Sequence, residues 1–153
     1  MASYGKCDFK GLKDFQKNLE KLNQQQVNLF MEACSKELAA RLLAKVIKRT
    51  PVGEYPSSSG KKGGTLRRNW TAGKNATDYA QSLRVNHFGD TYVIEIVNPT
   101  EYASYVEFGH RTPNHKGWVQ GKFMLTISEQ EIENAAPAIL EKKLMKLLGE
   151  CFK

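Results

Sequence analysis

The segment QSLRVNHFGDTYVIEIVN, residues 81–98, contains two alternating runs of apolar and polar residues on either side of Gly89-Asp90. Side chains alternate across a β-strand, and a Gly-Asp pair between two such runs favours a tight hairpin turn. We therefore predict an antiparallel hairpin with strands over 81–88 and 91–98, and a further strand over 66–72. The second run separates its side chains by face, with Tyr92, Ile94 and Ile96 on one side and Val93, Glu95 and Val97 on the other.

Upstream of this sheet, apolar residues recur every three or four positions, which is the spacing of one helix face. A first helix follows Asp8, a candidate N-terminal cap, and its apolar face contains Leu12, Phe15, Leu19 and Leu22. A second helix runs from about Gln25 to about Lys48. It must end before Pro51, because the residue before a proline is displaced from the α region. Its predicted apolar stripe contains Val27, Phe30, Met31, Cys34, Leu38, Leu42 and Val46.

Downstream of the sheet, Pro99 ends the last strand, since proline cannot donate to a β-ladder. A short helix is expected from Glu101 to about Glu107, with Thr100 as its cap and Gly109 closing it. From Phe123 onward the chain is again predicted to be helical, and Pro137 should kink that helix or split it.

This order of elements predicts an α+β fold: two N-terminal helices, a small antiparallel sheet, a short helix and a C-terminal helical region. The length of 153 residues favours a single domain over residues 1–153. Glycine, serine and other polar residues predict two mobile loops within it, at about 53–64 and 110–121.

The composition excludes several classes of protein. The chain is 41% hydrophobic and 25% charged, as in ordinary globular domains. Its first ten residues lack the apolar run of a signal peptide, and no stretch approaches the roughly 18 apolar residues of a membrane span. We therefore expect no membrane association, and we expect the chain to stay in the cytosol where it is made. The three scattered cysteines match neither a disulfide framework nor a zinc site.

No set of residues predicts catalysis, a metal or a cofactor. His110 and His115 are five residues apart in a loop, without the Cys or carboxylate partners of a metal site. The glycine-rich stretch 59–65 lacks the GxxxxGK[ST] register of a phosphate-binding loop. We therefore predict a protein that is not an enzyme and that binds no cofactor.

The net charge of +7 leaves a nucleic-acid-binding module as an alternative function. Basic side chains combined with tryptophans can bind DNA through phosphate contacts and base stacking. No known DNA-binding motif is present, however. The residues that raise this alternative are Lys61, Lys62, Arg67, Arg68, Lys74, His110, Arg111, Lys116 and Lys122, together with Trp70 and Trp118.

Four short motifs occur in order: TPVG at 50–53, GTLRRNW at 64–70, NP leading into YASYVEFGH at 98–110, and GWVQGKFML at 117–125. Together they resemble the tailed-phage neck and tail-component family that is named for the tenth gene product of a lambda-like coliphage. The similarity extends over about residues 50–131. One departure is the insert 54–63, because the family's Thr-Pro-Val stretch usually leads almost directly into its Gly-x-Leu-Arg motif.

The resemblance implies a structural subunit of the virion that forms a homo-oligomeric ring at the head–tail junction and helps to complete the tail. The implied partners are the head–tail connector and tail-terminator proteins, with possible non-specific contact to DNA in the channel. A closed ring needs two different patches on each subunit, and the loops are candidates for one of them. The predicted interface residues are Tyr55, Lys61, Lys62, Arg67, Arg68, Trp70, Tyr105, Glu107, His110, Arg111 and Trp118.

Overall fold

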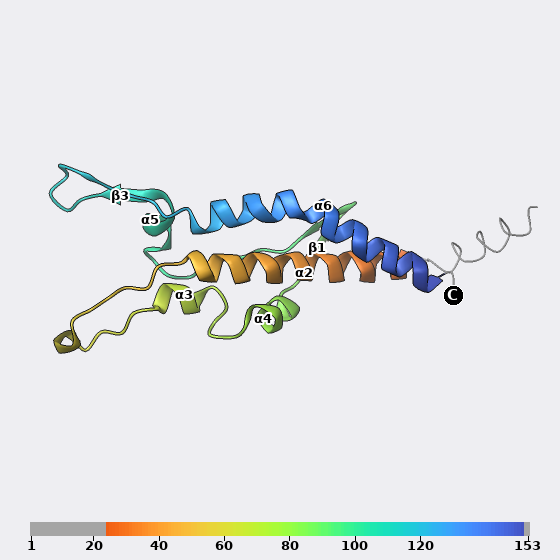
Figure 1. The fold of residues 1–153 in the computed structure, drawn as a ribbon, viewed down its shortest axis with the longest axis horizontal. Coiled ribbons are helices and arrows are strands. Elements are labelled where there is room, and N and C mark those ends of the chain that lie inside the picture. The colour runs from red at the N-terminus through yellow and green to blue at the C-terminus, as the bar shows by residue number, and fades with distance from the viewer. Residues whose placement is uncertain (1–23, 152–153) are drawn as a thin grey trace, which may run out of the picture.

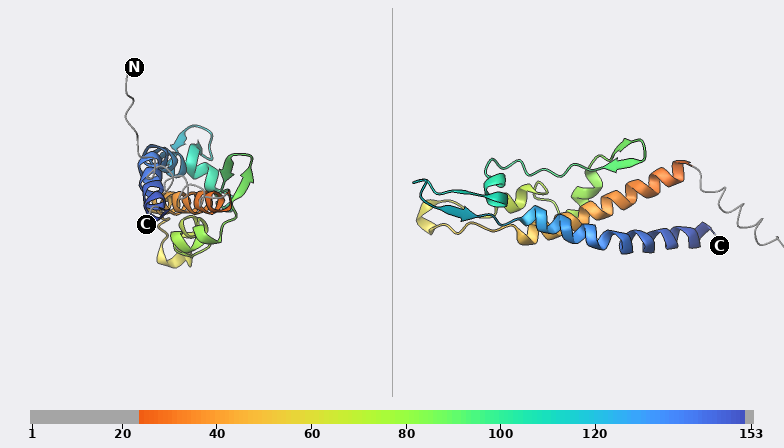
Figure 2. Two further views of the ribbon diagram at one scale, coloured as in Figure 1. Left: turned by 90° about the vertical axis from the view of Figure 1, so that its right-hand side faces the viewer. Right: turned by 90° about the horizontal axis from the view of Figure 1, so that it is seen from above.

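The computed structural model describes residues 24–151 (Figure 1). Two long helices, α2 (Gln24–Arg49) and α6 (Met124–Cys151), pack together and form an elongated body. Short helices and two small hairpins are arranged around them (Figures 1 and 2). The predicted first helix, with Asp8 as its cap, lies outside the described residues.

Helix α2 confirms the second predicted helix to within one residue at each end. Its last turn is closed by the backbone N–H of Thr50, which donates to the carbonyl of Val46 at 2.9 Å, and Pro51 follows at once. The buried residues are Cys34, Ala39, Leu43 and Val46. The predicted stripe was therefore wrong in part, because Leu43 is fully buried whereas Leu38 and Leu42 are half-buried.

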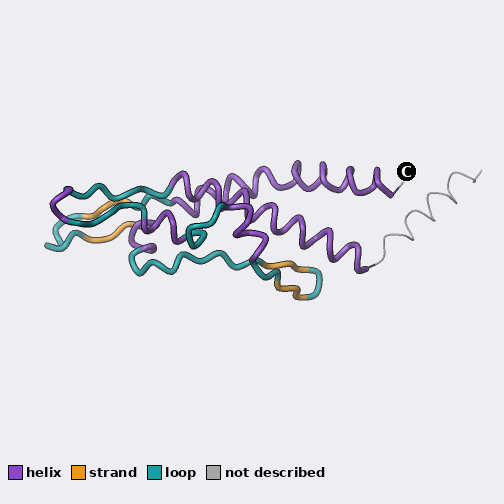
Figure 3. Tube along the Cα trace, turned by 90° about the horizontal axis from the view of Figure 1, so that it is seen from below, coloured by secondary structure: helices purple, strands orange, loops and turns teal. Residues whose placement is uncertain are grey.

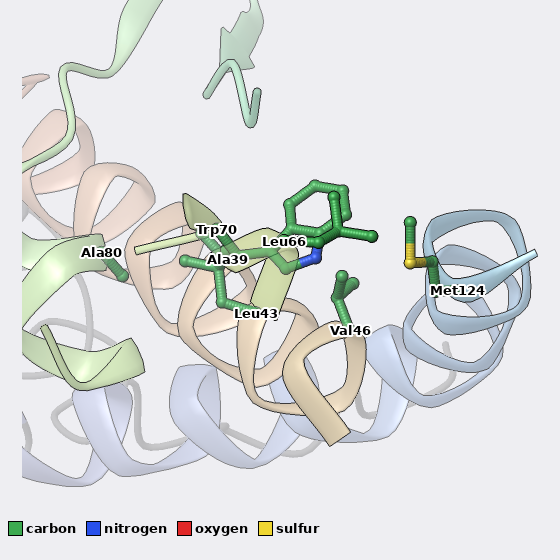
Figure 4. Packing of buried hydrophobic residues seen from close by; sticks show 7 residues of the cluster. All are labelled: Ala39, Leu43, Val46, Leu66, Trp70, Ala80 and Met124. Carbon is green, nitrogen blue, oxygen red and sulfur yellow. The ribbon is translucent and has the colours of Figure 1, made fainter. Parts of the chain in front are cut away.

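The core lies between α2, the start of α6 and two short helices on the other side of α2. Figure 4 shows Leu66 and Trp70 over α2, with Val46 between them and Met124 of α6. Ile94, Ile96 and Val106 cover this cluster from the segment beyond the first hairpin. The buried cluster consists of Ala39, Leu43, Val46, Leu66, Trp70, Ala80 and Met124.

The predicted strand over 66–72 is wrong, because this segment contains helix α3 (Thr65–Asn69). Leu66 and Trp70 are four residues apart, so one helical turn places both on the face that packs on α2. Helix α4 (Ala76–Ser82) follows and includes the first two residues of the predicted strand 81–88. The side chain of Asn75 caps α4 by accepting from the N–H of Asp78 at 2.8 Å.

The hairpin at Gly89-Asp90 is confirmed, although its strands are shorter than predicted. Strands β1 (Asn86–Phe88) and β2 (Thr91–Val93) pair antiparallel, with His87 opposite Tyr92. The rings of these two residues stack at a centroid distance of 4.3 Å. The predicted alternation begins in β2 and continues past its end, because Tyr92, Ile94 and Ile96 are half-buried while Val93, Glu95 and Val97 are exposed. Among the described residues, no strand pairs with the part beyond Val93.

The predicted short helix is confirmed as α5 (Ala103–Phe108), and Gly109 follows it with a φ of 86°. Thr100 does not cap this helix, because the helix begins after Tyr102 and has no side-chain cap. The polar loop expected over 110–121 is instead a second hairpin, formed by β3 (Gly109–Arg111) and β4 (Trp118–Gln120). Figure 3 shows the two hairpins at different places on the molecule.

The C-terminal helical region is a single helix, so Pro137 does not split it. Figures 1 and 2 show α6 changing direction about midway along its length, which agrees with the predicted kink. The fold is therefore α+β, but with two separate two-stranded sheets in place of one small sheet.

Candidate functional site

The first two of the four sequence motifs meet in space at the C-terminal end of α2. Thr50 and Trp70 are both buried, and the indole Nε1 of Trp70 donates to the Thr50 hydroxyl at 2.7 Å. That hydroxyl in turn donates to the carbonyl of Val46 at 2.7 Å. A buried polar group costs free energy unless it is hydrogen-bonded, and this chain of bonds satisfies both side chains. The first two motifs thus form one structural unit.

Arg67 strengthens the same junction. Its Nε and Nη2 atoms donate to the backbone carbonyl of Thr50 at 3.1 and 2.7 Å. This carbonyl lies just after the helix, where backbone acceptors have no partner within the helix. A cation at the C-terminal end of α2 also interacts favourably with the helix dipole. The side chain of Arg67 is therefore bound within the chain.

The third motif is tied to the second by two asparagines. Asn98 donates through Nδ2 to the carbonyl of Leu66 at 2.9 Å, and Asn69 donates to the hydroxyl of Thr100 at 2.8 Å. The N–H of Thr100 donates to the Oδ1 of Asn98 at 3.1 Å. These bonds fix the turn around Pro99 against α3, and so they position α5.

Glu107 connects α5 to the N-terminus of α6. Its buried carboxylate accepts from the backbone N–H of Leu125 through Oε2 and from that of Thr126 through Oε1, each at 2.9 Å. The Thr126 hydroxyl also donates to Oε1 at 2.7 Å. Free N–H groups and the positive end of the dipole make a helix N-terminus favourable for a carboxylate. Glu107 is thus a capping residue supplied by another helix.

A second polar contact joins α2 to α6. Lys45 donates to Glu131 at 2.8 Å, Arg49 donates to the other carboxylate oxygen of Glu131, and Arg49 also donates to the Ser128 hydroxyl at 3.0 Å. The hydrogen bonds from Arg49 and then Lys45 lower the pKa of Glu131 below its ordinary value of 4.5. Three turns earlier in α2, burial raises the pKa of the Cys34 thiol.

Two arms extend from this junction at the same end of the body (Figures 1 and 2). The first arm, residues 51–64, has only one short 3-10 helix, Ser57–Ser59, and its residues 51–62 are all exposed. Lys61 lies 5.9 Å from the centre of the Tyr55 ring. At its base, Arg68 donates to the carbonyl of Gly63 at 3.2 Å. The insert seen in the sequence forms most of this arm.

The second arm, residues 109–121, is the β3–β4 hairpin. Its base is held by Lys122 and Phe123, whose N–H groups donate to the carbonyls of Val106 and Glu107 at 2.8 and 3.0 Å. Phe108 packs edge-on against Phe123 at 6.5 Å, and Tyr105 packs against His110 at 5.8 Å. Most of these aromatic side chains are exposed all the same, so the base of this arm presents an apolar surface.

The predicted interface residues divide into two groups in the structure. Trp70 and Glu107 are buried and the half-buried Arg67 binds the carbonyl of Thr50, so these three side chains hold the subunit together, whereas Arg68 binds the carbonyl of Gly63 but is exposed at the base of the first arm. The interface prediction remains for those on or beside the arms. His110 is half-buried, while the exposed members are Tyr55, Lys61, Lys62, Arg68, Tyr105, Arg111 and Trp118. Sequence reasoning missed Thr50, Asn69 and Asn98 as structural residues, although all three lie within the motifs.

The described residues contain no group of three or more His, Cys, Asp or Glu side chains placed to hold a metal ion. Among the helices that the structure describes, none has the length and apolar character needed to cross a membrane. A shallow pocket lies between the first arm and α5, lined by Val52, Tyr55, Lys62, Tyr102 and Val106 among others. Its lining contains no carboxylate and no histidine; the titratable side chains are Tyr55, Lys62 and Tyr102.

Comparison with known families agrees with this arrangement. The family model for the bacteriophage HK97-gp10 tail component matches residues 13–109, which is more than half of the chain. The match includes the Thr50–Trp70 junction and α5, and it ends where the second arm begins. No curated protein and no solved structure gives a significant match.

Proposed function

The chain belongs to the HK97-gp10-like family of bacteriophage tail components, and we propose that it is a structural subunit of the phage neck. The family is structural and not enzymatic. In this proposal, several copies form a ring at the head–tail junction, which completes the tail and helps to attach it to the head. The connector and tail-terminator proteins are the neighbours on the two sides of the ring.

The observation that carries this proposal is the pair of arms at one end of the body. The first arm has no buried residue among positions 51–62. The second arm and its base expose Trp118 by 55% and Phe108 by 62%. Large aromatic side chains that are left exposed on one arm and its base favour an interaction site there. A ring subunit needs such a surface, together with a different patch on its body that receives the neighbour's arm.

The positive charge of the arms suits a ring that surrounds DNA. Lys61, Lys62, Arg111 and Lys116 are exposed and form no ion pair within the described residues. Contact with phosphates through such side chains is independent of sequence. Non-specific DNA contact is therefore part of the proposal. DNA binding as the main role has less support, because Trp70, Arg67 and Arg68 are engaged within the chain.

Light scattering tests the proposal directly. The purified protein is measured alone, and then mixed with the connector and tail-terminator proteins encoded beside it. We expect a ring-sized particle to form, at the latest when these partners are added. A protein that ignores both partners but binds short DNA duplexes, with a steep loss of affinity as salt increases, would instead favour the nucleic-acid module.

Limited proteolysis tests the role of the arms in the same samples. The first arm is exposed and largely irregular, so a protease should cut it readily in the free subunit. We expect assembly to protect it. Equal cleavage of this arm in the free and the assembled protein would show that it contacts no neighbour.

A further inference from the structure

Residues 94–97 form an extended segment whose backbone has no partner. The paired register of β1 and β2 ends at Asn86 and Val93, and the chain continues toward α5 as a lone extended segment (Figure 3). Strand pairing ends one residue earlier, at Val93. Within the described structure, no hydrogen bond involves the backbone N–H or C=O groups of residues 94–97. Unpaired strand backbone is a template for pairing with another chain.

The side chains hold this backbone in a fixed orientation. Ile94 and Ile96 pack against the buried core, whereas Glu95 and Val97 are exposed, with Val97 exposed by 55%. This two-residue alternation is that of a β-strand. The inner side chains are already anchored, so residues 94–97 would lose little conformational freedom when another strand binds. This lowers the entropic cost of association.

An apolar groove lies directly beside the segment. It is bounded by Tyr92, Ile94 and Ile96 on one side, and on the others by Ile132 of α6 and by Ser35, Leu38, Ala39 and Leu42 of α2. A strand laid along residues 94–97 would point alternate side chains into this groove. Strand addition of this kind gains affinity from main-chain hydrogen bonds and specificity from the pockets that receive side chains.

The charge pattern identifies the incoming strand. Residues 90–101 contain Asp90, Glu95 and Glu101 and no basic residue. Residues 109–122, which include the whole second arm, contain Arg111, Lys116 and Lys122 and two histidines, but no acidic residue. Glu95 and Arg111 are both exposed, and neither forms an ion pair within the described residues. Opposite charges of this kind fix the register and choice of partner.

We propose that the second arm of a neighbouring copy lies along residues 94–97 and adds a strand to this edge. The arm of the same chain extends away from the body, whereas the segment between β2 and α5 runs over it (Figure 1). The second arm and the edge at residues 94–97 are therefore two different patches of one subunit. A contact between the arm of one copy and the edge of the next can repeat around a ring. This inference rests on the proposed ring and names the surfaces that join its subunits.

Charge reversal tests the pairing. Glu95→Lys and Arg111→Glu should each raise the protein concentration needed for assembly by about tenfold or more, because each places like charges together. Mixing the two variants, or combining them in one chain, should restore assembly, since opposite charges then meet at the contacts. Glu129→Lys is the matched control for Glu95→Lys: it makes the same change in net charge at an exposed position on α6 and should have no effect.

Hydrogen exchange at residues 94–97 gives a second readout that distinguishes the two proposals. We expect fast exchange of these amides in the monomer and at least tenfold slower exchange in the assembly. A ring in which they still exchange fast, or in which the charge swap fails to restore assembly, overturns the strand addition but not the ring. Protection already present in the monomer also overturns it, because another part of the same chain would then cover the edge. A protein that stays monomeric with every partner overturns both proposals.

Discussion

The indole nitrogen of Trp70 and the hydroxyl oxygen of Thr50 are 2.7 Å apart in the buried junction that joins α3 to the end of α2. Twenty residues separate them in the sequence, and the whole first arm lies between them. Together with the two bonds from Arg67 to the Thr50 carbonyl, this bond closes the loop from which the arm extends and fixes the arm's two ends relative to the core.

Removing this hydrogen bond should destabilise the subunit. Trp70→Phe and Thr50→Val should each lower the free energy of unfolding by about 1–3 kcal/mol, because each leaves a buried polar atom unpaired or a cavity behind. The double variant should lose less than the sum, since both changes remove the same bond. Urea unfolding followed by circular dichroism measures all three. Trp118→Phe, at an exposed tryptophan, is the control and should change little.

Glu107 should be required for stability as the cap of α6. Glu107→Ala removes three hydrogen bonds to Leu125 and Thr126, and we expect a loss of about 1–3 kcal/mol. Glu107→Gln should lie between wild type and alanine, because an amide keeps one acceptor oxygen. Glu101→Ala, an exposed acid just before α5, is the control. Equal stability of the Glu107 and Glu101 variants in thermal unfolding would contradict the capping role.

The ion pairs of Glu131 should make stability depend on pH. Its pKa is lowered in the folded state by Arg49 and Lys45, so its contribution is fully present above the ordinary value of 4.5 and is lost as pH falls through the lowered pKa. Glu131→Gln should therefore be less stable than wild type at neutral pH, and the difference should vanish in acid. Urea midpoints across this range provide the measurement, with Glu133→Gln as the control. A difference that stays constant with pH would exclude this linkage.

Gly109 should be indispensable for the second arm. Its φ of 86° and ψ of 172° lie in a region that only glycine adopts readily, and an added Cβ would overlap the carbonyl oxygen of Val119. We expect Gly109→Ala to cost about 2 kcal/mol or more and to abolish the β3–β4 cross-strand contacts. Gly117→Ala is a fair comparison, because its Cβ would lie 3.4 Å from Thr112, an ordinary contact. Nuclear magnetic resonance of the hairpin amides would separate the two variants.

Local patterns predicted the elements whose signals lie within a few neighbouring residues. The helical spacing before Pro51 located α2, and Gly89-Asp90 located the first hairpin turn. The alternation at 92–97 predicted which side chains face the core, even where no strand pairing follows. In these segments the chain's own periodicity and its turn residues decide the structure.

The errors have specific physical causes. The segment 66–72 was assigned to a strand, but its two large apolar residues, Leu66 and Trp70, have helical spacing. Asn75 and Asp78 form a capping pair that marks the start of α4. The strand prediction for residues 81–88 did not take this signal into account. A helix start of this kind depends on side-chain to backbone bonds and not on apolar periodicity.

The second hairpin has almost no apolar alternation, so its sequence is typical of a loop. Its tip is instead held by polar bonds: the N–H of Gly117 donates to the Thr112 hydroxyl at 3.0 Å, and that of Lys116 donates to Asn114 at 3.1 Å.

The sequence identified the four motifs, but it did not show what their residues do in the fold. Trp70 and Glu107 were predicted to face partners, and only the packing of distant segments shows that their partners lie within the chain.

Pro137 lies at the middle of α6, where it removes one backbone donor from an exposed part of the helix. The fourteen residues beyond it form a rod of about 21 Å at 1.5 Å per residue. A change of about 10° at this bend would move the far end by about 4 Å while the capped N-terminal half stays in place. A change of bend at Pro137 would therefore move the C-terminal half of α6 against α2, to which Lys143 binds through Glu37, while the core around Met124 stays in place.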